Sequence, residues 1–597
     1  MSLAEPVLLS PTHRIAARHR LAPLVLVAWA AVVAASFVGG TTVIDSMSID
    51  DFMRLVQVRD LLGGQGWFDV VQHRLDPPAG VAMHWSRLVD APMAAFIYVL
   101  TLLVGRAGAE LAVAALWPPL LFLPALALVG ALARRLAGDA AAIAAVLLAA
   151  VAAPVLVHFR AGALDHHGLQ LALILAATWG ATAPMDARWQ PLLGGLASAL
   201  SLAVGLEMLP GIAAILAALG LRWAIEGAPA ARVTSTFGVA FGCGTAVLFA
   251  ATVPPAAWST PVCDAISAPW IGAAGLIGGA LALLASSTPR LATIKSRLAV
   301  GVGVGLGLGA VLTFAFSDCL RNPYADIDPR MAALWLAHVS EVQNALEVLQ
   351  NTPAEFLPIY GPPLAALALG IVAALRAPTQ RTLYLPPLFA LAALTAVAVW
   401  EVRGASSANL VAQPLLAAAI VELLSRRGRA VMLASLLAAS SPVLVLAGEG
   451  IGAIVNAVDP DRPSYVEGGP SACRRLADVT PLARVAPGRV VSFVDLGPAI
   501  LAGTEHAVLA APYHRNRAGN AAAFDVLVGD EAVARRALAE KRVDYVAVCP
   551  GSPERTNFER AAPQGLAARL SRGETPAFLE RIPGNAVDPL WVFRVRR

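Results

Sequence analysis

Acidic and imidazole side chains gather where apolar stretches of this chain end. The segment HFRAGALDHHGLQ lies between two such stretches and carries Asp165, His166 and His167. An acidic pair that begins with Asp50 follows the first apolar stretch. Carboxylate oxygens and imidazole nitrogens together suit Mn²⁺ or Mg²⁺. The sequence therefore predicts a divalent-cation site with Asp50, Asp165 and His167 as its ligands.

The acidic pair Asp50 and Asp51 also has a purely structural interpretation. Ser48 precedes both residues and is a good helix N-cap, and carboxylates are favoured in the first turn of a helix. The two acids differ by a single position, so the sequence does not decide which of them would act in chemistry. Both are candidate catalytic residues.

Three other ionisable residues lie at or between the ends of apolar stretches: Glu341 in HVSE, Arg403 in WEVRG and Glu207 in GLEMLP. A guanidinium matches a phosphate or pyrophosphate with its forked donors, so Arg403 is a candidate phosphate-binding residue. The alternative for Arg403 is an ion pair with Glu401 or a position at the membrane surface. The alternative for Glu341 is an ordinary acid on an amphipathic helix.

The composition is typical of a helical protein that crosses a membrane many times. Of 597 residues, 57% are hydrophobic and 14% are charged, and the mean hydropathy is +0.67. The formal net charge of +4 comes from arginines beside apolar stretches, which argues against a nucleic-acid partner. The basic, then apolar N-terminus predicts an uncleaved first span, with a cleavable signal peptide as the alternative.

Thirteen apolar stretches predict membrane spans. They are 21–43, 109–133, 139–158, 168–184, 190–206, 208–224, 233–252, 267–286, 298–316, 356–375, 383–401, 404–423 and 430–448. Segment 91–105 is also apolar but is short for a span. It either crosses the membrane or lies along its surface as a helix.

The positive-inside rule favours the surface position for segment 91–105, because the basic turns then all fall in the cytoplasm. These turns hold Arg134, Arg135, Arg188, Arg222, Arg232, Arg290, Lys295, Arg297, Arg376, Arg381, Arg426, Arg427 and Arg429. The same topology places segments 44–108 and 318–356, the Asp165 turn and the tail on the outer side. The short cytoplasmic loops contain no glycine-rich phosphate loop, which argues against chemistry on ATP or a nucleotide sugar inside the cell.

The tail 449–597 differs in composition from the apolar region 1–448. RVVSFVDLGPAILAG, EHAVLAAPYH and VDYVAVC predict short strands, and DEAVARRALAEKR predicts an amphipathic helix with acids first and bases last. We therefore expect a transmembrane domain over 1–448, which includes the outer loops 44–108 and 318–356. A C-terminal α/β domain outside the membrane is expected over 449–597.

The chain has five cysteines, and Cys243 falls inside a predicted span. The other four fall outside the membrane, where an oxidising compartment permits disulfides. We predict that Cys263 pairs with Cys319 and that Cys473 pairs with Cys549. The alternative is four unpaired thiols.

The order of these features resembles the catalytic subunit of oligosaccharyltransferases, which are membrane glycosyltransferases of the GT-C fold. That family takes glycan from a polyprenyl-linked phosphate donor on the outer face. The resemblance is carried by DDF at 50–52 and by VRDLLGGQGW, DPPAG and HWSRLVD in the first outer loop. It also includes GALDHH, ending at His167, HVSE, ending at Glu341, and VRGASSANLVAQP around Arg403. It covers nearly the whole chain and is strongest over 44–170.

The chain departs from the family in one motif. The family's Trp-Trp-Asp-Tyr-Gly block binds the Ser or Thr of an Asn-x-Ser/Thr acceptor. Here it corresponds at best to FVDLG, which keeps Asp495 and Gly497 without the tryptophans. The following LAAPYHRNRAGN, which contains His514, is either an acceptor surface or an ordinary loop. Asp495 and His514 are thus candidate acceptor-binding residues, and sequon recognition is not carried over.

The resemblance implies an inverting glycosyl transfer. A Mn²⁺ or Mg²⁺ ion on the three predicted ligands would neutralise the pyrophosphate of the donor, and Arg403 would help the leaving group. Asp50 or Asp51, together with Glu341, would orient or activate the acceptor.

We therefore expect a glycosyltransferase of the bacterial cytoplasmic membrane, with its active site and C-terminal domain facing the periplasm. It would transfer a sugar or oligosaccharide from a polyprenyl-linked donor to a protein, lipid or glycan acceptor. The alternative from another class is a transporter or membrane scaffold. Transport sites lie near the middle of the membrane, whereas the polar residues of this chain gather on one face.

Overall fold

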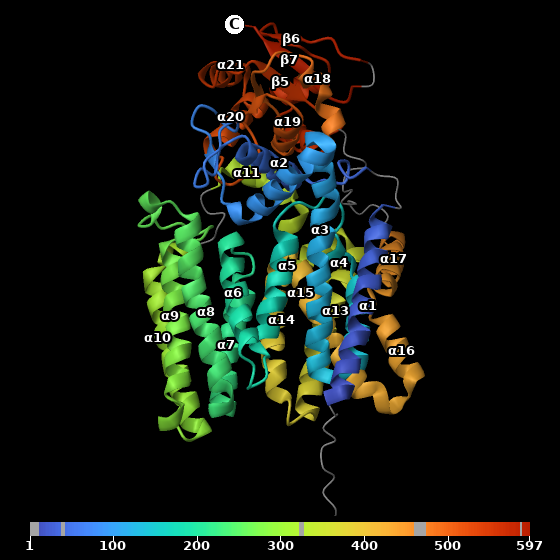
Figure 1. The fold of residues 1–597 in the computed structure, drawn as a ribbon. Coiled ribbons are helices and arrows are strands. Elements are labelled where there is room, and N and C mark those ends of the chain that lie inside the picture. Colours follow the sequence, from blue (N-terminus) through green and yellow to red (C-terminus); the bar gives the residue numbers. More distant parts are fainter. Residues whose placement is uncertain are drawn as a thin grey trace, which may run out of the picture.

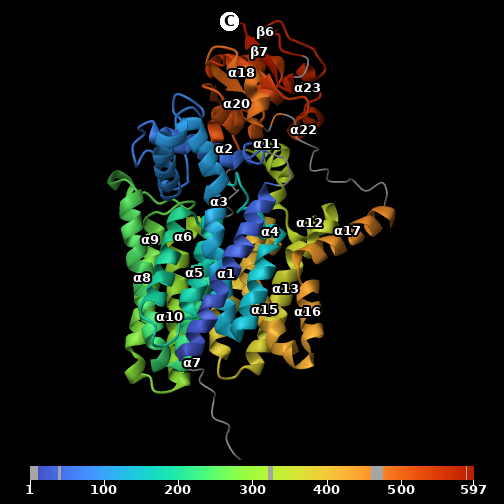
Figure 2. The same cartoon turned by 45° about the vertical axis from the view of Figure 1, so that its right-hand side comes forward.

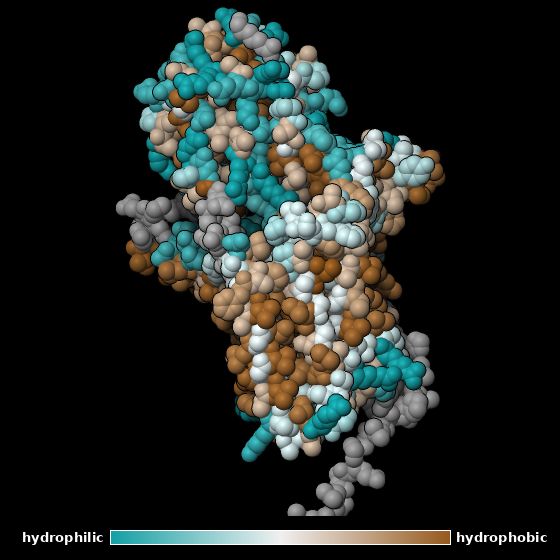
Figure 3. Space-filling model, turned by 90° about the vertical axis from the view of Figure 1, so that its left-hand side faces the viewer, coloured by the Kyte–Doolittle hydropathy of each residue, from teal (hydrophilic) through white to brown (hydrophobic). Residues whose placement is uncertain are grey.

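The computed structural model shows a bundle of helices that carries a smaller unit of helices and strands at one end (Figure 1). It describes residues 11–37, 42–320, 327–458, 473, 475–585 and 588–596. In that part of the chain, nine helices are long and apolar enough to cross a membrane by length and composition. Apolar residues cover the lower part of the molecule and hydrophilic residues its upper part (Figure 3). This is the surface of a multi-pass membrane protein.

Helical segments overlap all thirteen predicted spans. The bundle consists of α1 (Pro11–Ser36), α3 (Arg87–Ala150), α4 (Ala153–Leu156), α5 (His167–Ala181), α6 (Trp189–Val204), α7 (Leu209–Glu226), α8 (Ala228–Thr252), α9 (Ala268–Ser286), α10 (Ile294–Ala315), α13 (Pro353–Arg376), α14 (Leu385–Trp400), α15 (Ala405–Leu424), α16 (Arg429–Ala438) and α17 (Ser441–Val458). Helix α15 packs against α3, α13 and α14, and it is the most buried of the nine candidate spans. The bundle is thus built around α15.

Helix α3 contains two breaks. The backbone leaves the helical conformation at Gly105, where φ is +73°, and again at Ala137 and Gly138. The part before Gly105 contains predicted segment 91–105. One face of this part is buried, while Phe96 and Leu102 are exposed on the other. Such an amphipathic helix agrees with a position along the membrane surface.

The last predicted span, 430–448, is not a single helix. Helix α16 ends at Ala438 and α17 begins at Ser441, and Figure 2 shows α17 turned away from the axis of α16. Pro442 explains the break, because proline has no N–H and disfavours the helical conformation of the residue before it.

The upper unit combines the first outer loop with the C-terminal part of the chain. The first loop holds α2 (Ile49–Leu62) and a hairpin of β1 (Val71–Gln72) and β2 (Val81–Ala82). The C-terminal sheet has the order β4-β3-β5-β7-β6. Its strands are β3 (Arg489–Val491), β4 (Ala507–Val508), β5 (Tyr545–Val548), β6 (Leu579–Arg581) and β7 (Trp591–Val595). Parallel β4, β3 and β5 are followed by antiparallel β7 and β6.

Helices cover this sheet and connect it to the loop 318–356. They are α11 (Pro329–Leu334), α18 (Thr480–Ala483), α19 (Gly497–Gly503), α20 (Arg517–Val528), α21 (Glu531–Glu540), α22 (Pro553–Ala561) and α23 (Leu566–Ser571). Helix α12 (Ala345–Asn351) of the same loop packs instead against α13 and α14 of the bundle. The predicted amphipathic helix is α21, which is capped by Asp530. The predicted strand 489–503 is wrong beyond Val491. Gly497 and Pro498 begin α19 there, and proline is favoured in the first turn of a helix.

The first loop and the sheet share one apolar core. Phe52 of α2, Leu75 and Trp85 of the first loop, and Val490 and Val546 of the sheet belong to the same buried cluster. The loop also extends the edge of the sheet, because Leu75 forms a parallel bridge with Val508 of β4. Two segments that are more than 400 residues apart in sequence therefore form one body.

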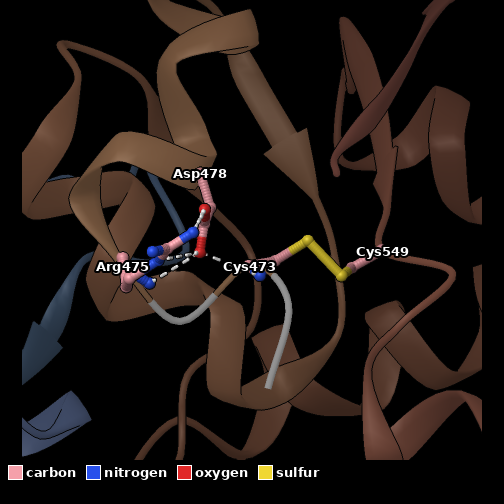
Figure 4. Close-up of a disulfide and its surroundings, with 4 residues drawn as sticks. All are labelled: Cys473, Arg475, Asp478 and Cys549. Atoms are coloured by element: carbon pink, nitrogen blue, oxygen red, sulfur yellow. Dashed lines mark hydrogen bonds and ion pairs between the residues drawn. A yellow bond between two sulfur atoms is a disulfide. The ribbon is translucent and has the colours of Figure 1, made fainter. Parts of the chain in front are cut away.

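Both predicted disulfides are present. Cys263 is bonded to Cys319 and Cys473 to Cys549. Figure 4 shows Cys473 beside Asp478, which accepts its backbone N–H at 3.0 Å. Among the described residues, Cys243 is the free cysteine.

The contact between α5 and α6 requires glycine. A Cβ added at Gly194 would lie 2.7 Å from the Phe237 ring and 2.8 Å from the Cα of Gly180. Small residues allow such close helix packing in membranes. We expect Gly194→Leu to destabilise the protein by about 1–3 kcal/mol through overpacking, measured as a lower Tm in detergent. Gly279→Leu on α9 is the control, because no atom lies within 4 Å of its added Cβ. Equal shifts in the two variants would contradict this account.

Candidate active site

A cavity of about 1080 Å³ lies between the C-terminal domain and the end of the bundle that faces it. Most of the predicted site residues line it together, although they come from five separate segments. These residues are Asp50, Asp165, His167, Glu341, Arg403, Asp495 and His514. Asp51 is the predicted site residue that does not line it.

The start of α2 separates the roles of the two adjacent acids. Ser48 caps the helix, and Asp51 completes a capping box by accepting the Ser48 N–H at 2.7 Å. The other carboxylate oxygen of Asp51 accepts the Asp165 N–H at 2.9 Å. Asp50 instead faces the cavity, where the Tyr513 hydroxyl lies 3.2 Å from Oδ1. Asp51 thus ties two loops together, and Asp50 is free to meet a ligand.

The turn before α5 holds a chain of acids and imidazoles. His166 lies between two carboxylates, with Nδ1 2.5 Å from Asp165 Oδ1 and Nε2 2.9 Å from Glu207 Oε1. Gln170 donates a further hydrogen bond to Glu207 at 2.6 Å. His167 is more exposed, and its Nε2 lies 3.3 Å from Asp165 Oδ2. Both ring nitrogens of His166 are therefore engaged, whereas the His167 side chain is 32% exposed and lines the cavity.

Arg54 of α2 helps to hold this turn in place. Its side chain is fully buried and donates to Asp90 at 2.9 Å and to Asp165 Oδ1 at 3.2 Å. Its guanidinium also lies 4.4 Å from the centre of the Trp85 ring, a cation–π contact. Because Arg54 and His166 occupy Oδ1 of Asp165, Oδ2 is left for His167 and for a ligand in the cavity.

The negative charges in the cavity disfavour the ionised form of Asp50. Burial raises the pKa of Asp50 well above its ordinary value, and the charges of Asp165 and Glu341 raise it further. Burial also raises the pKa of Asp51 to about 6. Burial would raise the pKa of Asp165 too, but the imidazoles of His166 and His167 outweigh it and hold that pKa well below its ordinary value.

These residues fit a divalent cation. Ligand atoms of Asp165, His166 and His167 lie within 4.8 Å of one another, and Asp50 is close enough for its charge to be disfavoured by Asp165. Burial lowers the pKa of His166, but Asp165 and Glu207 raise it to about 10. Both ring nitrogens of His166 already face carboxylates, those of Asp165 and Glu207. Asp50, Asp165 and His167 therefore stay the candidate ligands, two carboxylates and an imidazole.

Glu341 and Arg403 lie on other walls of the cavity. Glu341 belongs to a short 3-10 helix (Ser340–Val342) and is exposed. Arg403 forms the ion pair with Glu401 that the sequence offered as an alternative, at 3.0 Å between Nε and Oε2. Its side chain is nevertheless 40% exposed and lines the cavity. The ion pair thus orients the Arg403 guanidinium and leaves it accessible from the cavity.

The two predicted acceptor-binding residues already have protein partners. Trp335 donates its indole N–H to Asp495 at 2.7 Å. His514 Nε2 lies 2.6 Å from Asp264, an acid in the loop after α8. Both side chains contribute to the cavity wall, but each is held by a residue of another segment.

The sequence alone did not single out several residues that the structure places at the site. Arg54 stands four residues after Asp50, so both lie on one face of α2. Tyr513 directly precedes His514 in the segment that was proposed as an acceptor surface. The i, i+4 spacing is a signal for Arg54. No local signal indicates the contact between Tyr513 and Asp50, which are 463 residues apart.

Removing the Arg54 charge leaves Asp165 with its two histidine contacts and Asp90 with Arg87 alone. Breaking a buried ion pair costs about 3–5 kcal/mol, so we expect Arg54→Met to lower the Tm strongly. Arg106→Gln is the control, because Arg106 is 43% exposed in its pair with Glu110 and exposed pairs contribute about 0–1 kcal/mol. A Tm for Arg54→Met as high as that of the control would refute the proposed role of Arg54.

No protein-family model matches this sequence, and no curated protein matches it. Solved structures of the archaeal oligosaccharyltransferase AglB from Archaeoglobus fulgidus are similar. For its complex with an inhibitory peptide and a dolichol-phosphate, the TM-score is 0.64 at 16% identity, over 94% of this chain and 73% of that chain. The apo form of the Archaeoglobus fulgidus oligosaccharyltransferase gives 0.67 at 16% identity, over 90% and 71%.

The complex of that enzyme with Zn and sulfate gives a TM-score of 0.63 at 15% identity, over 96% of this chain and 73% of that chain. Sequence identities this low establish a common fold and no more. The TM-scores confirm the fold that the sequence resemblance predicts. That resemblance is carried by the motifs of the first outer loop, by the Asp165 turn and by HVSE. This chain has the fold of an archaeal oligosaccharyltransferase.

Proposed function

We propose that this protein is a membrane glycosyltransferase that transfers a sugar or oligosaccharide from a polyprenyl-linked phosphate or pyrophosphate donor. The observation that carries the proposal is the convergence of acids, an imidazole and an arginine from separate segments in one cavity. The shared fold adds support, because the AglB structure contains a dolichol-phosphate and a peptide. Transport sites lie near the middle of the membrane. The acids, the imidazole and the arginine of this cavity lie at one end of the bundle, which suits a lipid-linked substrate better than a solute that crosses the membrane.

The outer side of a bacterial cytoplasmic membrane is the proposed location of the cavity. Helix α5 starts at the cavity with His167 and ends at Ala181, and α6 returns from Arg188 toward Glu207. Basic residues such as Arg188 and Arg222 therefore lie at the end of the bundle away from the cavity. The positive-inside rule assigns that end to the cytoplasm. The cavity and the C-terminal sheet would then face the periplasm.

Asp50, Asp165 and His167 are the proposed ligands of a Mn²⁺ or Mg²⁺ ion. When bound there, the ion would neutralise charge on the donor phosphates and so stabilise the leaving group. Arg54 and His166 fix the orientation of Asp165, and Asp51 fixes the backbone of the same residue. We assign Asp51 to this positioning role and not to catalysis.

The remaining cavity residues divide between donor and acceptor. Arg403 would bind the donor phosphate with the guanidinium nitrogens that its pair with Glu401 leaves available. Asp50 and Glu341 would orient the attacking group of the acceptor, since both face the cavity. Asp495 and His514 would contribute to the acceptor wall. The acceptor is a protein, a lipid or a glycan.

The first test is transfer by the purified full-length protein in detergent. A polyprenyl-pyrophosphate-linked sugar serves as donor, with a panel of peptide, lipid and glycan acceptors. We expect Asp50→Asn to reduce transfer by about 100-fold or more, the scale at which loss of a positioned acid or base acts. Asp45→Asn is the matched control, because Asp45 is an exposed acid just before α2 that does not line the cavity. If folded protein binds donor but transfers nothing to any acceptor, a transporter or scaffold becomes the better account.

The second test removes the divalent cation. We expect EDTA to abolish transfer by the wild type. Added Mn²⁺ or Mg²⁺ should restore transfer, because the bound ion would neutralise charge on the donor phosphates. Asp165→Asn should need much higher metal concentrations for any recovery. Transfer that is unaffected by EDTA after exhaustive dialysis would exclude the proposed cation site while leaving the fold and the cavity in place.

A further inference from the structure

A second group of metal-ligating side chains lies at the edge of the cavity, away from the Asp165 turn. It consists of His84, Asp264 and His514, whose ligand atoms all lie within 4.8 Å of one another. The imidazole rings of His84 and His514 are 4.9 Å apart between centres. None of the reaction steps proposed above uses His84 or Asp264.

Three separate parts of the chain supply these residues, and each part is held firmly. His84 follows β2 in the first loop, beside buried Trp85. Asp264 follows Cys263, which is bonded to Cys319. His514 precedes α20, and the neighbouring Arg515 donates two hydrogen bonds to Asp264, at 2.7 and 2.6 Å. The three ligands are therefore preorganised before any ion binds.

One buried atom in this group has no partner. Nδ1 of His84 is buried and makes no hydrogen bond to any residue that the structure describes. A buried polar atom without a partner costs about 1–3 kcal/mol, and a bound ion or water is one explanation for such an atom.

We propose that His84, Asp264 and His514 form a second cation site, which binds a zinc-type transition-metal ion. Two imidazoles and one carboxylate are a common ligand set for Zn²⁺, with a water in the fourth position. A hard ion such as Mg²⁺ is disfavoured, because it prefers oxygen ligands and Arg515 already neutralises Asp264. Arg515 would stay as an outer partner that orients the carboxylate.

The ion would join the first loop, the loop after α8 and the C-terminal sheet at the rim of the cavity. Because such a site exists only in the folded protein, its occupation stabilises the folded state. The inference goes beyond the proposed glycosyl transfer and does not rest on it. A protein with no transferase activity could still bind metal here.

The test is Co²⁺ binding to the full-length protein in detergent, followed by visible absorption, with Zn²⁺ competition and Tm as further readouts. Asp165→Asn removes the first site, and we expect it to keep the Co²⁺ absorption and a Zn²⁺-dependent rise in Tm. In the same background, His84→Gln and His514→Gln should each weaken Co²⁺ binding by more than about tenfold. His73→Gln is the control, because His73 is an exposed histidine of the same loop.

Two results would overturn the proposal. One is the absence of Co²⁺ absorption in folded Asp165→Asn protein. The other is undiminished absorption in either His84→Gln or His514→Gln. In both cases the group would be an ion-pair contact between Asp264 and Arg515, with no role for a metal. If one histidine variant fails to fold, the other still decides the question.

Discussion

The buried guanidinium of Arg54 is the interaction on which the cavity depends. It is bonded to Asp90 and Asp165 and lies against the Trp85 ring. A buried charge is tolerated only when it is paired and hydrogen-bonded. The positions of α2, the start of α3 and the Asp165 turn are therefore coupled through one side chain. Any movement of one of these segments would leave a buried charge without its partner.

The C-terminal domain forms the remaining wall of the cavity. It shares its apolar core with the first outer loop, so it cannot move away without exposing that core. Through this packing, Tyr513 reaches Asp50 and Asp495 reaches Trp335. The bundle alone would offer an open, solvated group of acids. With the sheet in place, Asp50 is half-buried near Asp165 and Glu341. Burial and these charges raise its pKa, which a bound cation would lower again.

The sequence predicted much of the fold because apolar stretches of span length and basic turns are local signals. It missed the break before Ser441 and the helix after Val491, because proline and glycine override the apolar pattern there. At the candidate site, residue type and position grouped Asp50, Asp165 and His167, and the structure places all three on one cavity. The separate roles of Asp50 and Asp51 were not, since they depend on which carboxylate meets the Asp165 backbone. Tyr513 could not be predicted, because its contact depends on the packing of a distant domain.

Local sequence signals differ from contacts that depend on distant packing, and this difference explains why donor binding is easier to infer than acceptor recognition. Cations and phosphates impose fixed ligand types, so acids, an imidazole and an arginine at the ends of spans keep a recognisable pattern. Acceptor recognition depends on the shape of a wall, and here the corresponding segment is tied to its surroundings. Glu554 accepts the backbone N–H groups of Val494 and Asp495, while Trp335 bonds the Asp495 side chain. FVDLG makes these contacts without the tryptophans and the tyrosine of the family's block. An acceptor of the proposed transfer must therefore be sought by its fit to this wall, because the family's motif does not predict it.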